Sequence, residues 1–507
     1  MPLNRRSAGV LAHITSLPGP YGMGDFGPGA YRFVDWLASA QQSVWQWLPT
    51  TPIGPGNSPY QSGSAFAGSP LMVALEPLVQ RGWLAEPVLP GGGFPAERVD
   101  FGLAVPWRLR QLRLAAAGFS ARATPLDHAD FATWCDTHAD WLDDYALFMA
   151  LEVAHAGQPW WTWNSGLRQR SSQAIVAASQ KFADEVFFCK FVQWCFDTQA
   201  RALKAYANGL GISILGDVPI FIAHHSADCW ARPDLYFLDA MFQPTVVAGC
   251  PPDSMAPEGQ RWGNPLYRWD RMAAEDFGWW TARMRRALHL ADVLRIDHFR
   301  GFAGYYEIPA SCANAVQGRW VSGPGQAVFD AMQRALGEVP IVAEDLGVIT
   351  PDVEQLRDRC RFAGMKILQF AFDGDPSNGF LPHNYGKNCV AYTGTHDNNT
   401  VRGWWQSAST REQAFAVRSL GCVPNALPRA RMHALCNSVA NTVIFPLQDV
   451  LGLDGAHRMN TPGSVGGTNW AWRCESTMLD PETAKTLRRL TAASGRGLLQ
   501  TLNLPKG

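Results

Sequence analysis

The sequence contains no hydrophobic run long enough to cross a membrane and no block of basic residues. A membrane-spanning helix needs about 20 consecutive apolar residues, and proteins that bind nucleic acid cluster Lys and Arg on one face. The net charge of this chain is −1. We therefore expect neither a membrane nor a nucleic acid among its partners.

Paired cysteine motifs are also missing. The 11 cysteines are scattered singly, and none forms a C-x-x-C pair. An odd number without paired spacing is typical of reduced thiols, not of a disulfide framework or a zinc site, so we expect a cytoplasmic protein. His224 and His225 are adjacent and would not converge on one ion from a regular strand or helix, so we expect no metal site.

A serine-hydrolase elbow, G-x-S-x-G, is absent as well, which argues against an esterase triad. Tryptophan, by contrast, is abundant, with 21 residues. We expect most of these side chains to pack in the core, but indole faces also stack on sugar rings. The aromatic content mildly favours a carbohydrate site.

The 507-residue chain alternates short apolar runs with helical patterns. In several runs the charged residues gather at the C-terminal end, which is the active-site end of a (β/α)8 barrel. The sequence therefore predicts an α/β fold, a (β/α)8 TIM barrel over residues 1–507 with helical and loop insertions. An open doubly wound sheet would favour a glycine phosphate loop after a strand, whereas the only glycine run, 91–93, follows none. The eight expected strands are 9–15, 44–48, 212–221, 292–299, 340–346, 365–372, 389–397 and 441–451.

Two segments interrupt this alternation. Residues 76–208, between the second and third strands, are mostly helical in pattern, with helices expected at 105–117, 131–155 and 172–208. Residues 223–270, after the third strand, are rich in Pro and Gly and are expected to form a long loop over 223–267. A loop of this length suits an active-site lid over the barrel mouth.

Four acidic residues lie at the ends of expected strands: Asp217, Asp297, Glu344 and Asp397. Any one of them is more often structural than catalytic, and a structural ion pair is an equal alternative for Asp297. Because the strand ends of a barrel converge, however, these side chains are expected to meet. Two carboxylates that flank one bond are the requirement of glycosidic chemistry, one as nucleophile and one as proton donor.

Two histidines, His298 and His396, each lie next to one of these acids. They fit two interpretations about equally well. One is a neutral donor to a sugar hydroxyl, and the other is a packed histidine whose hydrogen bonds are satisfied within the core.

Eight longer motifs are spread over nearly the whole chain: TSLPGPYGMGDFG (15–27), SPYQSGSAFAGSP (58–70), GDVPIFIAHHSADCWA (216–231), GQRWGNPLYRW (259–269), RIDHFRGF (295–302), AEDLGVITP (343–351), TGTHDN (393–398) and RMNTPG (458–463). Together they resemble the motifs of bacterial amylomaltases. These enzymes, also called 4-α-glucanotransferases or disproportionating enzymes, are retaining relatives within the α-amylase clan.

The resemblance implies transfer of an α-1,4-glucan segment from a donor to an acceptor through a covalent glycosyl-aspartate, without metal or cofactor. It implies maltooligosaccharides, amylose or other α-1,4-glucans as partners, and glucose as an acceptor. By position, Asp297 resembles the nucleophile, Glu344 the general acid/base, and Asp397 the third acid, which holds the distorted donor sugar. The expected substrate-binding residues are Tyr60, Asp217, Gln260, Trp262, Arg295, His298, Asp345, His396 and Asn460.

The chain departs from the family pattern in two loops. Where the family usually has Pro-Pro-Asp-Tyr-Phe, this chain has Ser254 and Met255 after Asp253, so two aromatic residues of the expected acceptor lid are missing. Where the family often has a tyrosine before Ser58, this chain has Pro55. The second difference puts a surface glucan-binding site in doubt.

Two alternative functions remain open. A hydrolase of the same clan would pass the glycosyl group to water, and a non-catalytic glucan-binding protein would keep the aromatic residues but lose an acid. The intact Asp297, Glu344 and Asp397 argue against the second alternative.

Overall fold

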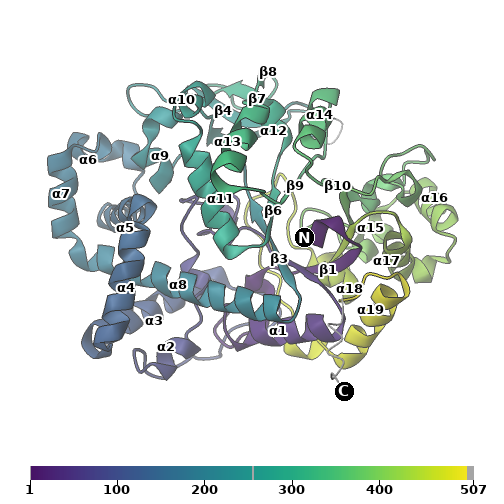
Figure 1. The fold of residues 1–507 in the computed structure, drawn as a ribbon, viewed down its shortest axis with the longest axis horizontal. Helices are drawn as coiled ribbons and strands as arrows, with labels where there is room; N and C mark the ends of the chain where they lie inside the picture. The colour runs from purple at the N-terminus through teal and green to yellow at the C-terminus, as the bar shows by residue number, and fades with distance from the viewer. Residues whose placement is uncertain (1, 254–255, 499–507) are drawn as a thin grey trace.

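The computed structural model describes residues 2–253 and 256–498 (Figure 1). Its centre is a sheet of eight parallel strands in the order β10-β11-β12-β1-β2-β3-β6-β9. A further parallel bridge joins Val342 of β9 to Ala363, directly before β10, and brings the two edges of the sheet together. The predicted (β/α)8 barrel is confirmed. Its strands are β1 (Ser7–Leu11), β2 (Val44–Gln46), β3 (Ser213–Val218), β6 (Val293–Ile296), β9 (Ile341–Ala343), β10 (Gly364–Ile367), β11 (Cys389–Tyr392) and β12 (Thr442–Pro446).

The strands end earlier than the sequence predicts. The apolar run after β10 turns into a 3-10 helix, Leu368–Ala371, and the run after β12 becomes α18 (Leu447–Val450). Segment 447–450 is largely buried, and Leu368 and Ala371 are buried in the 3-10 helix, so the apolar composition of these segments does not distinguish them from the strand. At the carboxyl end of a barrel the chain leaves the sheet to build the loops of the site.

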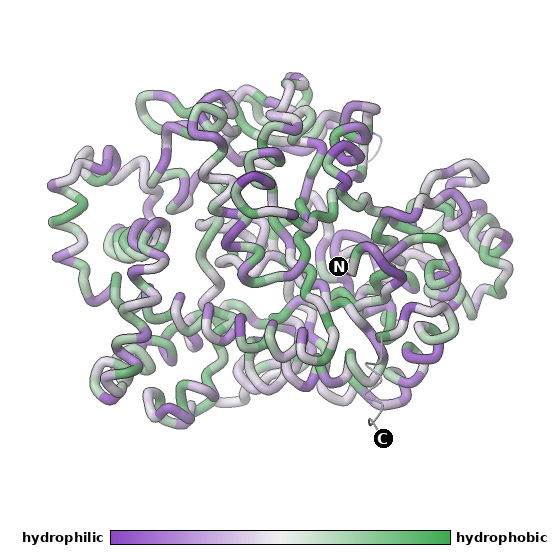
Figure 2. The backbone as a smooth tube through the Cα atoms, in the orientation of Figure 1, coloured by the Kyte–Doolittle hydropathy of each residue, from purple (hydrophilic) through white to green (hydrophobic). Residues whose placement is uncertain are grey.

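The barrel interior is filled by side chains from all eight strands, as expected of a packed barrel core. These side chains form one buried cluster, which includes Leu11, Val44, Leu215, Val293, Val342, Met365, Ile367, Val390, Tyr392 and Ile444. The outer helices alternate hydrophobic and hydrophilic residues along their length (Figure 2). This alternation lets each helix cover the barrel with one face and meet solvent with the other.

The segment between β2 and β3 forms a lobe of helices beside the barrel (Figure 1). Two of the helices expected there are each divided in two. His138 (φ −114°, ψ 13°) separates α4 from α5, and Phe182 (φ −110°, ψ 27°) separates α7 from α8. The helices of the lobe are α2 (Glu76–Gln80), α3 (Phe101–Arg122), α4 (Pro125–Thr137), α5 (Ala139–Ala154), α6 (Ser165–Arg168), α7 (Ser172–Lys181) and α8 (Ala183–Gly209).

The expectation of a long loop over 223–267 is wrong. This segment holds α9 (Ala227–Ala231) and the strands β4 (Val246–Cys250) and β5 (Gln260–Pro265). They join β7 (Gly304–Pro309) and β8 (Arg319–Ser322) in an antiparallel sheet of order β5-β4-β7-β8. Ser254 and Met255, at the tip of the expected lid, lie outside the described residues, so the lid role stays a prediction.

The remaining helices surround the barrel. Helix α14 begins at Pro351, directly after Thr350. Among the described residues, no helix combines the length and the apolar character that a bilayer span requires. All 11 cysteines are free, while the cytoplasmic location stays a prediction. The helices are α1 (Pro28–Ser39), α10 (Trp269–Ala274), α11 (Gly278–Leu290), α12 (Arg300–Ala303), α13 (Gln326–Leu336), α14 (Pro351–Arg359), α15 (Val401–Ser407), α16 (Thr410–Leu420), α17 (Leu427–Asn437) and α19 (Pro481–Ala493).

A buried arginine, Arg496, fastens the segment after α19 to the amino-terminal end of β1 and the segment before β12. Its guanidinium donates five hydrogen bonds, all to backbone carbonyls, and Arg6 and the amide of Ser7 supply only three of these acceptors with a second donor, so its removal leaves a buried junction short of donors. We expect Arg496→Met to destabilise the fold by about 3 to 5 kcal/mol, seen as a lower apparent Tm than in wild type. Arg489→Met, on the exposed face of α19, is the control and should leave the Tm unchanged. The acceptors are the carbonyls of Ser7, Cys436, Ser438, Ala440 and Asn441.

Candidate active site

Two of the predicted acids follow neighbouring strands of the barrel directly. Asp297 comes after β6 and Glu344 after β9, and these strands pair in parallel. The amide of His298, the residue after Asp297, donates to Oε2 of Glu344 at 2.9 Å. This contact holds the Glu344 carboxyl beside the backbone that carries Asp297.

Arg295 connects Asp297 to a second carboxylate. One amino group, Nη2, lies 2.7 Å from Oδ1 of Asp297, and the other, Nη1, donates to both oxygens of Asp217 at 2.9 and 2.8 Å. Because side chains alternate along a strand, Arg295 and Asp297 point to the same side. The other oxygen of Asp297, Oδ2, has no hydrogen-bond partner among the described residues, and the side chain is 31% exposed. One oxygen is therefore anchored and the other is accessible.

Glu344 has the properties of a proton donor. Burial, reinforced by the negative charge of Asp297, raises the pKa of Glu344 to about 8. The positive charge of Arg295 acts in the opposite direction but does not cancel the shift. The Glu344 carboxyl is therefore mostly protonated near neutral pH.

Asp397, in the loop after β11, is held by two side chains. Asn460 donates to Oδ1 of Asp397 at 2.6 Å, and Nε2 of His396 lies 3.3 Å from Oδ2. Arg458 donates to the backbone carbonyl of Asp397 at 2.6 Å. The side chain of Asp397 is 41% exposed, so it faces the solvent side of the site.

Tyr60 connects the group around Asp217 and Arg295 to the group around His396 and Asp397. Its hydroxyl donates to Oδ2 of Asp217 at 2.8 Å, and its ring stacks on His396 with centroids 5.2 Å apart. Trp470 packs against both rings, at 5.7 Å from Tyr60 and 5.9 Å from His396. Sequence reasoning missed Trp470 and Arg458; the abundance of tryptophan was the only signal for the first.

The small antiparallel sheet contributes further side chains to the site. Trp262 on β5 approaches His298 edge to face at 4.8 Å, and its indole donates to Oε1 of Gln260 at 3.0 Å. His298 has a left-handed backbone (φ 50°), which is uncommon for a residue other than glycine. Burial lowers the pKa of His298 to about 4, so its ring is neutral and offers one donor and one acceptor.

Asp345 does not join the other predicted site residues. Its Oδ1 accepts from the amide of Met365 at 2.7 Å, and its Oδ2 accepts from Arg357 at 2.5 Å. Adjacent strand residues face opposite sides, so Asp345 points away from the side of Glu344. It ties β9 to β10 and α14, and we assign it a structural role in place of the expected contact with substrate.

The adjacent histidines of the sequence also have structural surroundings. His224 stacks on Trp161 with centroids 3.8 Å apart, and His225 lies 3.4 Å from Glu152. Within residues 2–253 and 256–498, no group of three His, Cys, Asp or Glu side chains is arranged to hold a metal ion. Pro55 begins a short 3-10 turn, Pro55–Asn57.

Residues 12–478 match the sequence profile of a family described as 4-alpha-glucanotransferase. The chain is 50% identical over 499 residues to a 4-alpha-glucanotransferase of Thermus thermophilus, covering 97% of this chain and 99% of the relative. It is 44% identical over 504 residues to a 4-alpha-glucanotransferase of a Synechocystis species, covering 98% of this chain and 100% of the relative.

Among solved structures, the amylomaltase of Streptococcus agalactiae in complex with acarbose superposes with a TM-score of 0.93. That protein is 35% identical, and the match covers 97% of this chain and all of the other. These similarities confirm the predicted resemblance to the amylomaltases and the expectation of a glucanotransferase. The chain belongs to the 4-alpha-glucanotransferase family.

Proposed function

We propose that this enzyme transfers α-1,4-glucan segments between maltooligosaccharides, and to glucose, by a retaining double displacement at Asp297 and Glu344. The observation that carries the proposal is the difference between these two neighbouring acids. Asp297 has one oxygen on Arg295 and the other accessible, whereas Glu344 holds its proton near neutral pH. Environments that separate two carboxyl groups in this way define a nucleophile and an acid.

In the first step, Oδ2 of Asp297 attacks the anomeric carbon of the donor sugar. Glu344 gives its proton to the glycosidic oxygen as that bond breaks, and the reducing-end fragment leaves. In the second step, Glu344 removes a proton from the acceptor hydroxyl, which attacks the same carbon and releases Asp297. Two inversions at one carbon retain the α configuration.

Asp397 supplies binding energy that is specific to the transition state. We assign it to the hydroxyls at C2 and C3 of the donor sugar, which it holds more strongly as the ring flattens toward an oxocarbenium ion. Asn460 and His396 fix the orientation of its carboxylate. Tyr60, Trp262, Gln260 and His298 line the sides as further glucan contacts.

The catalytic unit includes part of the second insertion, since Gln260 and Trp262 lie on β5. We infer that residues 1–507 form a single barrel with segments 76–208 and 223–270 inserted, and that β5 supplies the acceptor-side wall through Trp262. A hydrolase of the same clan would share the glycosyl intermediate but pass it to water.

The products formed from maltotriose distinguish these functions. We expect a ladder that includes chains longer than the donor, resolved by chromatography of the reaction. Glucose and shorter chains alone would assign a hydrolase, and no products would assign a binding protein.

The pH dependence of transfer follows from the proton on Glu344. The acid must be protonated in the first step, and the pKa of Glu344 lies at about 8. We therefore expect kcat/KM for maltotriose to fall tenfold per pH unit above about 8, because the protonated fraction falls by that factor. A profile that stays flat to pH 10 would contradict the role of Glu344 as the acid.

Arg295→Lys tests the bridge between Asp217 and Asp297. An ammonium group cannot donate to both carboxylates in the geometry of the guanidinium, so Asp297 loses its anchor. We expect kcat for maltotriose to fall about 100-fold with a folded protein. Arg285→Lys, at an exposed position of α11, is the matched control and should retain wild-type kcat.

A further inference from the structure

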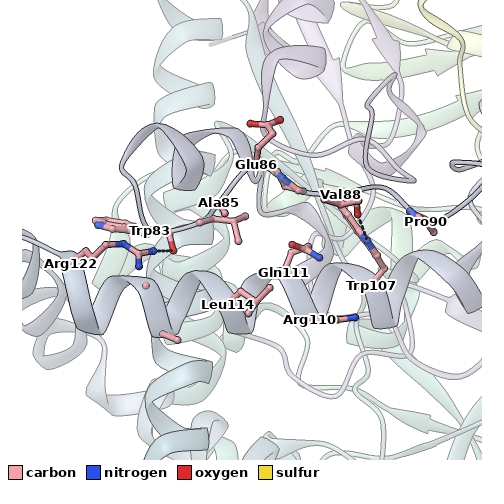
Figure 3. A pocket seen from close by; sticks show the side chains of 14 residues that line it. Trp83, Ala85, Glu86, Val88, Pro90, Trp107, Arg110, Gln111, Leu114 and Arg122 are labelled. Carbon is pink, nitrogen blue, oxygen red and sulfur yellow. Dashed lines mark hydrogen bonds between the residues drawn. The ribbon is translucent and has the colours of Figure 1, made fainter.

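The loop that carries Asp397 leads from the carboxyl end of β11 to the start of α15. Asp297 and Glu344 follow their strands directly, whereas Asp397 lies well inside this loop. Because loops are less fixed in position than strands, the place of Asp397 depends on what holds the loop. The groove of the helical lobe, between α3 and the segment 83–90 (Figure 3), is lined by no residue of this loop. The support of the loop lies at the end of β12 instead.

One buried carboxylate, that of Asp449, holds both ends of the loop. Asp449 belongs to α18, directly after β12, and is 4% exposed. Its Oδ2 accepts from the hydroxyl of Thr393, the first residue after β11, at 2.6 Å. Its Oδ1 accepts from the amide of Val401, the first residue of α15, at 2.7 Å. A single side chain therefore fixes the distance between the two ends of the loop.

The surroundings of Asp449 make these two hydrogen bonds important. Burial raises the pKa of Asp449, and the two hydrogen bonds and the positive charge of Arg431 oppose this rise. Arg431 on α17 is fully buried, with its guanidinium 3.9 Å from the ring centroid of Trp404 and 4.7 Å from that of Phe372. A buried carboxyl group is costly unless donors and an opposite charge compensate it. Asp449 therefore depends on the donors of the loop, just as the loop depends on Asp449.

The loop is also tied together by its own side chains. Oδ1 of Asn398 accepts from the amide and from the hydroxyl of Thr395, at 2.8 and 3.0 Å. The same hydroxyl accepts from the amide of Asp397 at 3.3 Å. A shift at either end of the loop is therefore passed on to Asp397 and is not absorbed within the loop.

We infer that Asp449 and Thr393 are positioning residues for Asp397. Neither is open to substrate, because Thr393 is fully buried and Asp449 nearly so. The inference rests on the role proposed for Asp397, which holds the donor sugar more strongly in the transition state. Without the hydrogen bond from Thr393, the start of the loop shifts and the Asp397 carboxylate moves away from the hydroxyls at C2 and C3.

The test removes the hydroxyl of Thr393 and keeps the shape of the side chain. Thr393→Val has nearly the same volume without a donor, and Thr393→Ser restores the donor. Thr442→Val is the matched control, because Thr442 is equally buried and its hydroxyl also forms a side-chain hydrogen bond, with Ser7 at 2.9 Å. Thr442 begins β12, at the end of the barrel opposite to the site.

We expect Thr393→Val to lower kcat for maltotriose about tenfold and to keep KM within about twofold of wild type, because the lost alignment counts mainly in the transition state. Thr393→Ser should recover most of the lost kcat. Thr442→Val should keep the wild-type kcat, although it also loses a buried hydrogen bond. Circular dichroism at the assay temperature checks that each protein is folded. Thr393→Ala, which lacks the hydroxyl and adds no methyl group toward Asp449, repeats the test if Thr393→Val does not fold.

A double-mutant cycle separates positioning from a general loss of stability. Thr393→Val is combined with Asp397→Asn, and wild type, both single variants and the double variant are compared by fluoride release from α-maltosyl fluoride. The fluoride leaving group keeps slow variants measurable. If Thr393 acts through Asp397, its effect disappears once Asp397 is altered. We expect Thr393→Val to change the rate of the Asp397→Asn protein less than about twofold.

The proposal is overturned if the two substitutions act independently, so that the double variant shows the product of both losses. It is also overturned if Thr393→Val and Thr393→Ala keep the wild-type kcat, or if Thr442→Val loses as much kcat as they do. In these cases a slow Asp397→Asn enzyme still supports the role proposed for Asp397. A wild-type rate of Asp397→Asn would contradict that role and, with it, this inference.

Discussion

Replacing Asp297 by asparagine is expected to lower kcat for maltotriose transfer by roughly 10⁴-fold or more. The amide occupies the same volume, and its oxygen still accepts from Arg295, as Oδ1 of the carboxylate does. It is not a competent nucleophile toward the anomeric carbon, so the covalent intermediate does not form. Steady-state kinetics with circular dichroism of the same sample measures the loss and checks the fold.

The matched control for this change is Asp276→Asn. Asp276 carries the same chemical group on the surface, where it pairs with Arg334 and its side chain is 73% exposed. Its removal should leave kcat unchanged. Activity of Asp297→Asn within tenfold of wild type, in a preparation free of contaminating enzyme, would contradict the assignment of the nucleophile.

Glu344→Gln is expected to lose much more activity on donors whose leaving group needs a proton than on donors whose leaving group needs none. With maltotriose the leaving oxygen needs a proton, so we expect a loss of roughly 10³-fold or more. With an α-glycosyl fluoride the leaving group needs none, so formation of the intermediate should keep a substantial part of its rate. The rate of fluoride release and the rate of maltotriose transfer, measured on the same preparation of the variant, give the loss of activity on each donor.

Breakdown of the intermediate is the second part of this prediction. Without Glu344 as base, the acceptor hydroxyl attacks slowly and the glycosyl-enzyme accumulates. An equal loss on both donors would mean that Glu344 orients the substrate instead of donating a proton.

The barrel is predictable from the sequence because strands buried on both faces are continuous apolar runs, and the run at 292–299 contains β6. The acids at the carboxyl end of the barrel are predictable because they follow such runs. The exact ends of the strands are not predictable from the sequence, because the apolar run of β10 continues into the 3-10 helix Leu368–Ala371 without a change in composition.

The small sheet could not be predicted in this way. It pairs residues distant in sequence, such as Val247 with Ile308, and its strands contain Gly249 and Pro265, which favour a loop interpretation. Which of two adjacent acids faces the site is also a matter of strand orientation. Because side chains alternate along a strand, Glu344 faces the site and Asp345 faces Arg357. The sequence shows two adjacent acids but not which of them faces the site.

The central claim is that the glycosyl group is carried on Asp297. The most direct measurement is to mix Glu344→Gln with an α-maltosyl fluoride, stop the reaction with acid, digest the protein and sequence the labelled peptide by mass spectrometry. We predict one glycosyl group on the peptide that contains Asp297, with the fragment ions assigning it to that side chain. A label on Asp217 or Asp397, or release of fluoride with no labelled peptide at any time, would contradict the account.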